Sequence, residues 1–117
     1  MTSKISFKIA DGNLLIKFEG DLDNMTTYQY KTKLSEVIKK NQIQKVIIDL
    51  NNVTFIDSSG IGLILGRFNQ ISSYGGQLIV CGINKHIKKT IQISGVASII
   101  DVYEDSYEQL KQSEVFI

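Results

Sequence analysis

The chain has 117 residues, of which 43% are hydrophobic and 21% charged, as is typical of one globular domain over residues 1–117. Its 13 basic and 12 acidic residues leave a net charge of +1, which argues against nucleic acid as a direct partner, because phosphate binding needs a basic surface. No apolar run approaches the roughly 20 residues of a membrane span and no signal-peptide core is present, so we expect a cytoplasmic protein without a membrane partner.

The first predicted elements form a β-hairpin. Apolar and polar residues alternate from Ile5 to Ile9, a pattern typical of a half-buried strand. Residues 11–13, Asp-Gly-Asn, favour a tight turn, and residues 14–18 form the second strand. A helix capped by Asn24 or Thr26 is expected next.

The rest of the chain alternates helices with strands. In chain order, the sequence predicts a helix over 25–40, a strand over 45–50, a helix from about 58 to 74, a strand over 77–83, a short helix over 85–93, a strand over 98–103 and a closing helix over 104–112. This order indicates an α/β fold, in which a mixed sheet of an N-terminal antiparallel hairpin and parallel strands packs with about four helices. Sites in such folds lie beyond the C-terminal ends of the strands, here residues 20–24, 51–59 and 82–85.

Few residues suggest a metal, a cofactor or a disulfide. The single cysteine, Cys81, excludes an internal disulfide, and its apolar surroundings predict a buried, unreactive thiol. No group of His, Cys, Asp and Glu has the spacing of a metal site, and the Walker A pattern is absent. We therefore expect no metal and no cofactor.

The segment VTFIDSSGIGLILG, residues 53–66, places two serines beside an aspartate between two apolar runs. Asp57 or Ser58 can cap the helix that follows, and the residues alone favour this interpretation. A catalytic serine is disfavoured, because the Gly-x-Ser-x-Gly pattern is missing and His86 is the only histidine. Weak anion binding at the helix start and a phosphoaspartate receiver with Asp49 or Asp57 remain as alternatives.

Two further features of this region suggest a surface for a partner. On a helical wheel, Leu63 lies opposite the apolar stripe, and Gly62 and Gly66 lie near the same outer side, so a partner or a neighbouring helix is expected to approach there. The segment GDLD, with Asp21 and Asp23, is expected near the serines, either as solvated turn residues or as an acidic rim.

FIDSSGIGLILGRFNQI, GDLD, VIIDL and YGGQLIVCGI together resemble the STAS-domain anti-sigma factor antagonists, over essentially the whole chain. The resemblance implies a switch that is not an enzyme and is monomeric when free. Its unphosphorylated form would bind an anti-sigma factor that is also a serine kinase, and so release a sigma factor. Phosphorylation of Ser58 would stop this binding, and a PP2C-like serine phosphatase would restore it.

The resemblance also assigns the family's acidic loop residue to Asp23 and its motif aspartate to Asp57. A STAS domain that senses a nucleotide or a small ligand is the alternative function. The predicted partner-binding surface consists of Asp23, Asp57, Ser58, Ser59, Gly60, Gly62 and Leu63.

Overall fold

The computed structural model describes residues 3–113, which form a five-stranded mixed sheet with helices on both faces. The strands lie side by side in chain order, β1 (Lys4–Ala10), β2 (Asn13–Leu22), β3 (Lys45–Ile56), β4 (Gln77–Cys81) and β5 (Asp101–Val102). β1 pairs antiparallel with β2, and each later pair is parallel. The helices are α1 (Asn24–Lys40), α2 (Ser58–Ser72), α3 (Lys88–Ser94) and α4 (Tyr107–Lys111), with a short 3-10 turn η1 (Val96–Ser98) after α3. This confirms the predicted fold class and element order.

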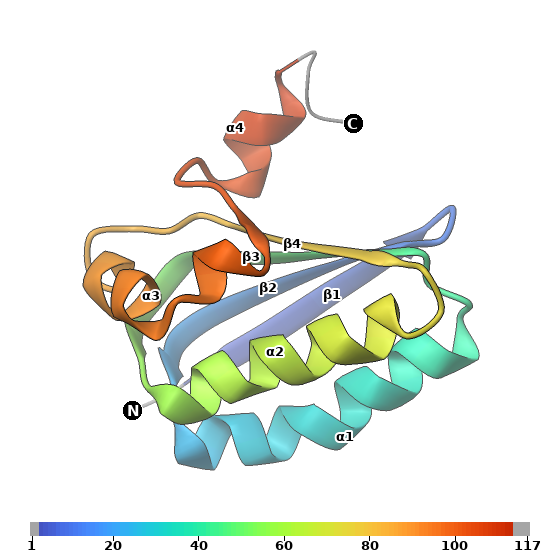
Figure 1. Cartoon of the computed structure of the whole chain (residues 1–117), viewed down its shortest axis with the longest axis horizontal. Coiled ribbons are helices and arrows are strands. Elements are labelled where there is room, and N and C mark those ends of the chain that lie inside the picture. Colours follow the sequence, from blue (N-terminus) through green and yellow to red (C-terminus); the bar gives the residue numbers. More distant parts are fainter. Residues whose placement is uncertain (1–2, 114–117) are drawn as a thin grey trace.

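The sheet separates a large core from a small one. Figure 1 shows α1 and α2 side by side along one face of the sheet and α4 on the opposite face. Because successive strand residues point to opposite faces, Val46 and Ile48 of β3 join the large core under α1 and α2. Ile47 joins the small cluster under α4, together with Cys81. Burial raises the pKa of the Cys81 thiol to about 12, which agrees with the predicted inert cysteine.

The hairpin forms where it was predicted, but its first strand is less covered than its pattern suggests. Asp11 and Gly12 adopt the left-handed backbone of a two-residue turn, with φ of 52° and 79°. Phe7 and Ile9 are 37% and 40% exposed, because β1 is the edge strand and has only β2 beside it. The predicted half-buried strand is therefore an exposed edge at these two positions.

Strands β2 and β3 both run further than predicted. Residues 51–56, which were expected to lie beyond the end of the strand, continue β3 and pair with the end of β2, down to the register pair Leu22 and Ile56. β4 ends at Cys81 and does not follow them. The side-chain amide of Asn84 donates to three carbonyls of β3 there, those of Leu50, Asn51 and Val53, at 2.8–3.1 Å.

The helices end close to their predicted limits, but α3 and α4 each begin three residues later than predicted. The strand predicted over 98–103 is shorter, because residue 98 belongs to η1 and β5 pairs with β4 only at Asp101 and Val102. Asn41 is the C-cap of α1, and Gly95 ends α3 in the left-handed conformation, with φ of 76°. Within residues 3–113, no helix combines the length and apolar character that crossing a membrane requires.

Candidate functional site

The starts of α1 and α2 lie together at one edge of the sheet. Each helix begins two residues after its strand ends, with Asp23 between β2 and α1 and Asp57 between β3 and α2. Because Leu22 and Ile56 are register partners in adjacent parallel strands, the two aspartates leave the sheet at neighbouring points. The backbone N–H of Asp57 donates to the carbonyl of Leu22 at 3.4 Å. The predicted proximity of GDLD and DSSG is confirmed.

Asp57 caps α2. Its Oδ1 accepts hydrogen bonds from the backbone N–H groups of Ser59 at 2.8 Å and Gly60 at 3.2 Å. These donors have no partner within the helix, so the carboxylate satisfies them and also complements the positive end of the helix dipole. Of the two residues predicted as possible caps, Asp57 rather than Ser58 takes the role.

Asp23 caps α1 in the same way, and the predicted caps Asn24 and Thr26 were wrong. Asp23 Oδ1 accepts from the N–H groups of Met25 and Thr26, both at 3.1 Å. Thr26 Oγ1 accepts in return from the Asp23 N–H at 2.9 Å, which completes a capping box. The missed signal was the Asp-x-x-Thr spacing. Asp21 lies in β2, and its Oδ1 accepts from the Thr54 hydroxyl at 3.2 Å.

The two serines have different surroundings. Ser58 is the first residue of α2 and is exposed, and its hydroxyl makes no hydrogen bond to any side chain or backbone group of residues 3–113. Ser59 is half-buried, and its Oγ donates to Asn24 Oδ1 of α1 at 3.3 Å. Ser58 is therefore the hydroxyl that a second protein can reach, whereas Ser59 links the two helix starts.

The glycines of α2 also differ. A Cβ added to Gly60 would lie 2.5 Å from the Leu22 carbonyl oxygen and 2.6 Å from Ile56 Cγ1, so the fold itself requires this glycine. A Cβ added to Gly62 or Gly66 would meet no atom within 4 Å. The predicted approach of a neighbouring helix to these two positions is therefore wrong.

The prediction that Leu63 faces outward was also wrong. Its side chain is only 4% exposed and belongs to the large core. The helical wheel identified the side of α2 that faces the sheet, but α1 covers a second side. One turn further, Arg67 Nη1 donates to the Lys31 carbonyl of α1 at 2.8 Å, which shows how closely the two helices pack.

Leu63 forms part of a hollow of about 300 Å³ between the starts of the two helices. The hollow was not foreseen, because it combines residues of two helices more than thirty positions apart. Its remaining lining residues come from both helices and are Asn24, Thr27, Tyr28, Lys31, Ser59 and Gly62.

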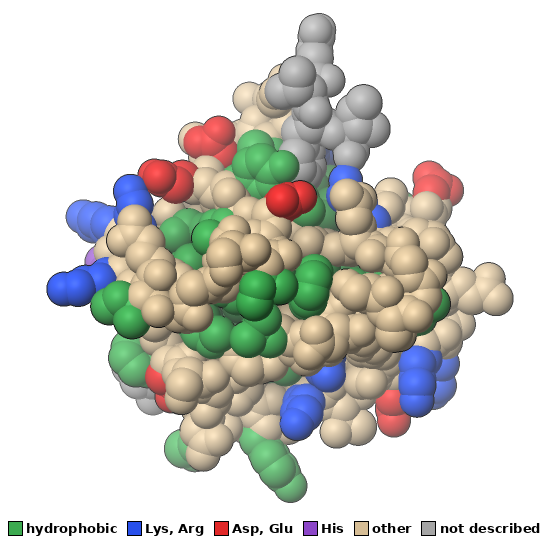
Figure 2. Space-filling view, viewed as in Figure 1, with side chains coloured by type: hydrophobic (Ala, Val, Ile, Leu, Met, Phe, Trp, Pro, Cys, Tyr) green, Lys and Arg blue, Asp and Glu red, His purple; other side chains and the backbone are tan. Residues whose placement is uncertain are grey.

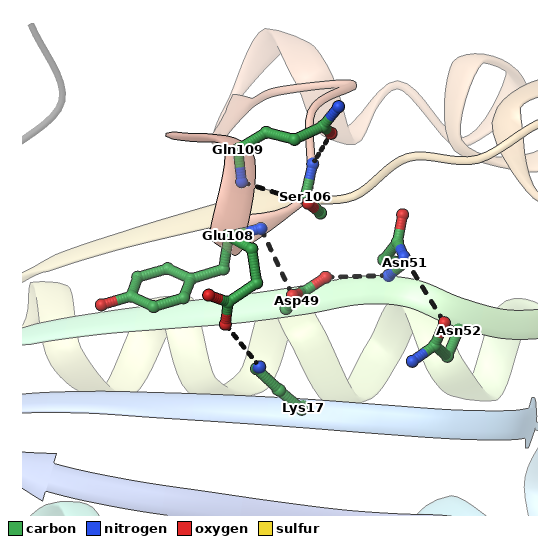
Figure 3. Close-up of polar contacts among 8 residues, drawn as sticks. Lys17, Asp49, Asn51, Asn52, Ser106, Glu108 and Gln109 are labelled. Atoms are coloured by element: carbon green, nitrogen blue, oxygen red, sulfur yellow. Dashed lines mark hydrogen bonds and ion pairs between the residues drawn. The ribbon is translucent and has the colours of Figure 1, made fainter. Parts of the chain in front are cut away.

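Asp49 does not belong to this site. Its Oδ1 accepts from the Asn51 N–H at 2.9 Å, and its Oδ2 accepts from the Tyr107 N–H at 3.3 Å, at the start of α4 (Figure 3). Beside it, Lys17 pairs with Glu108 at 3.0 Å, and this contact raises the pKa of Lys17 and lowers that of Glu108. Asp49 thus holds α4 on the other face of the sheet, and a phosphoaspartate receiver centred on it is not supported.

The edge site brings a serine hydroxyl and two helix-capping carboxylates together near the surface. Ser58 has no hydrogen-bonded base among residues 3–113 that would activate it as a nucleophile, and the same residues hold no group of three metal-ligating side chains. What the site offers is a free hydroxyl on a helix start, two nearby carboxylates that cap helices, and a shallow hollow.

Comparisons with known proteins identify the family of the chain. The model of the STAS domain matches residues 4–109. An anti-sigma F factor antagonist of Paenibacillus polymyxa is 31% identical over 115 residues, which cover 98% of each protein. Among solved structures, the anti-sigma factor antagonist SpoIIAA in its unphosphorylated form aligns with a TM-score of 0.78 at 24% identity, over 91% of each chain. The Bacillus cell fate determinant SpoIIAA in its phosphorylated form aligns with a TM-score of 0.71 at 24% identity, over 91% of this chain and 95% of that one.

Proposed function

Since the chain belongs to the STAS domain family, we propose that it is an anti-sigma factor antagonist switched by phosphorylation of Ser58. In its unphosphorylated form it binds an anti-sigma factor that is also a serine kinase, and a sigma factor is released. The kinase phosphorylates Ser58, the affinity falls, and a PP2C-like phosphatase restores the binding form. The name of the Paenibacillus polymyxa relative supports the partner class.

One observation supports Ser58, rather than Ser59, as the phosphorylation site. Its hydroxyl is exposed at the first position of α2, and it makes no hydrogen bond within residues 3–113. A phosphoryl group added there breaks no bond of the folded domain. Ser59, by contrast, would have to give up its bond to Asn24.

Electrostatics make one phosphoryl group sufficient for the switch. A phosphoserine carries about −1.5 to −2 charges at pH 7. Two unit charges ~6 Å apart repel by roughly 3 kcal/mol at an effective dielectric near 20 and by less in solvent, so the repulsion between Asp57 and the phosphate grows when a partner excludes water. Burying the phosphate against a partner adds a desolvation cost. A thousandfold loss of affinity needs only about 4 kcal/mol, which these effects can supply without refolding.

The structures of the relative SpoIIAA support a local mechanism. That protein has been solved in both unphosphorylated and phosphorylated forms, and both align with this chain at TM-scores of 0.78 and 0.71. A STAS fold is therefore compatible with either state.

The proposal is tested by incubating the protein with its cognate anti-sigma factor and ATP, followed by mass spectrometry. We expect one phosphoryl group, on Ser58. Ser58→Ala should bind the anti-sigma factor and stay unmodified, and Ser59→Ala, the matched control, should still be phosphorylated. Comparable phosphorylation of Ser58→Ala would show that the site is wrong, and absence of binding by the wild-type protein would contradict the function.

A ligand sensor is the second candidate, and one observation favours it. A hollow of about 670 Å³ lies between α4 and the sheet, with Lys8, Lys17, Lys45 and Lys111 among its lining residues. Lysines suit the phosphates of a nucleotide, although Asp11 and Glu108 also line this hollow and Lys17 already pairs with Glu108. Calorimetric titration with ATP and GTP in the absence of any kinase separates the two functions, because tight binding there would support the sensor.

A further inference from the structure

The start of α2 alone offers a partner little apolar surface. Its accessible residues, Ser58, Ser59 and Gly62, are small, whereas Gly60 and Leu63 are buried. A stable protein–protein interface usually covers about 800 Å² on each partner and depends on a few large side chains, often Tyr, Trp, Met or Arg. Leu63, which the sequence suggested for this purpose, is turned into the core. The apolar contact has to come from a neighbouring element.

The first turns of α1 carry such side chains. Tyr28 is 86% exposed and Met25 is 77% exposed, and they lie three residues apart, so they are neighbours on the helix surface. Figure 2 shows hydrophobic side chains projecting from the lower edge of the molecule, where Figure 1 shows α1. Neither side chain makes a hydrogen bond within residues 3–113 or packs into a core cluster, so the fold does not explain them.

Of the two exposed residues, Tyr28 lies next to the serine site. It lines the hollow together with Ser59 and Gly62 of α2 and with Lys31, one turn further along α1. Other large hydrophobic residues are exposed elsewhere, such as Tyr74 at 48% beyond the end of α2, but they do not line this hollow. Single exposed apolar residues are common, so the argument depends on this shared position.

We propose that Met25 and Tyr28 form an apolar anchor for the anti-sigma factor, next to but separate from the serine contact. The inference rests on the proposed function, which supplies the partner. The matching surface of the partner is an apolar pocket that takes the tyrosine ring, with an acidic group facing Lys31 on the rim of the hollow. Phosphorylation of Ser58 would then weaken one part of a two-part interface.

The test compares the binding of three variants to the purified cognate anti-sigma factor, without ATP, by calorimetry. Tyr28→Ala should lose about 30-fold in affinity, which corresponds to the roughly 2 kcal/mol of an interface hot spot, and Met25→Ala about fivefold. Tyr74→Ala is the matched control and should bind within twofold of the wild type. Because Met25 and Tyr28 lie largely in solvent, their substitution should change the melting temperature little, whereas Tyr74 is only 48% exposed, so the affinity of Tyr74→Ala is measured below its own melting temperature.

The outcomes distinguish a failure of the anchor from a failure of the proposed function. If the wild type binds and Tyr28→Ala and Met25→Ala bind equally well, the anchor is wrong while the proposed function stands. If Tyr74→Ala loses as much as Tyr28→Ala, the effect is not specific to the start of α1, and the anchor is again wrong. If the wild type does not bind at all, the proposed function itself fails.

Discussion

Asp23 has two properties that substitutions can separate. Its carboxylate caps α1 and also brings negative charge to the edge of the sheet beside Ser58. Asparagine is as good an N-cap as aspartate, whereas alanine at an N-cap costs about 0.5–2 kcal/mol. We therefore expect Asp23→Asn to keep the unfolding free energy within a few tenths of a kcal/mol of the wild type. If the anti-sigma factor contacts the negative charge of Asp23, the Asp23→Asn variant should also bind it more weakly.

Urea unfolding and calorimetric binding, measured on Asp23→Asn and Asp23→Ala, check this expectation. A loss of stability in both variants, with unchanged binding, would make Asp23 a structural residue only.

Gly62 offers a sharper test of the partner surface. A Cβ at this position meets nothing within 4 Å in the free protein, and alanine is favoured over glycine in a helix by about 1 kcal/mol. Gly62→Ala should therefore raise stability and lower affinity for the anti-sigma factor, because the methyl group would occupy space that the partner needs.

Gly66→Ala is the control for this experiment, since its Cβ is equally unobstructed one turn further from the serines. Thermal unfolding should show similar gains for both variants, and only Gly62→Ala should bind more weakly. Equal affinity of both variants and the wild type would remove Gly62 from the interface. Gly60→Ala, in contrast, should destabilise, because its methyl group would collide with Leu22 and Ile56.

At the scale of the elements, the sequence predicted every helix and strand in order but misjudged the ends of β2 and β3, the length of β5 and the starts of α3 and α4. Residues 51–56 have only two buried positions, Val53 and Ile56, and register shifts interrupt the pairing with β2. The alternation that identifies a strand is lost there, so a polar loop was the natural interpretation. Leu63 was misjudged for a related reason, because packing between α1 and α2 cannot be read from the pattern of α2 alone.

The candidate site could be predicted only in part, because part of it depends on the packing of α1 against α2. DSSG and GDLD were placed together correctly, since strand ends of a parallel sheet converge. The contribution of Asn24, Tyr28 and Lys31 depends on the way two helices pack, which no local pattern encodes.

Asn84 is hydrogen-bonded to the extension of β3, and this leads to a prediction. Its amide donates to three carbonyls beyond the end of β4. Leaving such acceptors without partners costs about 1–3 kcal/mol, so Asn84→Ala should lower stability by that order. Hydrogen exchange should speed up at residues 51–56. Asn69→Ala, on the exposed side of α2, is the control and should have little effect; unchanged exchange in Asn84→Ala would show that β2 alone holds the extension.

At the scale of the whole molecule, the switch should leave the fold intact. The serine site lies at one edge, while Asp49, Lys17 and Glu108 hold α4 on the opposite face of the sheet. Phosphorylation of Ser58 should therefore shift amide NMR signals at the starts of α1 and α2 and leave those of β4 and α4 unchanged. Shifts spread across the whole sheet would contradict a local block and indicate a rearranged domain.

The meeting of two helix starts at one edge has a consequence for how such a protein could diversify. Ser58, the proposed phosphorylation site, belongs to α2, while the exposed side chains around Tyr28 belong to α1, in a separate stretch of the chain. With the anchor proposed on α1, substitutions along residues 25–31 would alter which partner fits and leave Ser58 unchanged. Partner choice and regulation can thus evolve separately, and a genome with several such antagonists could keep their signalling pathways insulated through α1 alone.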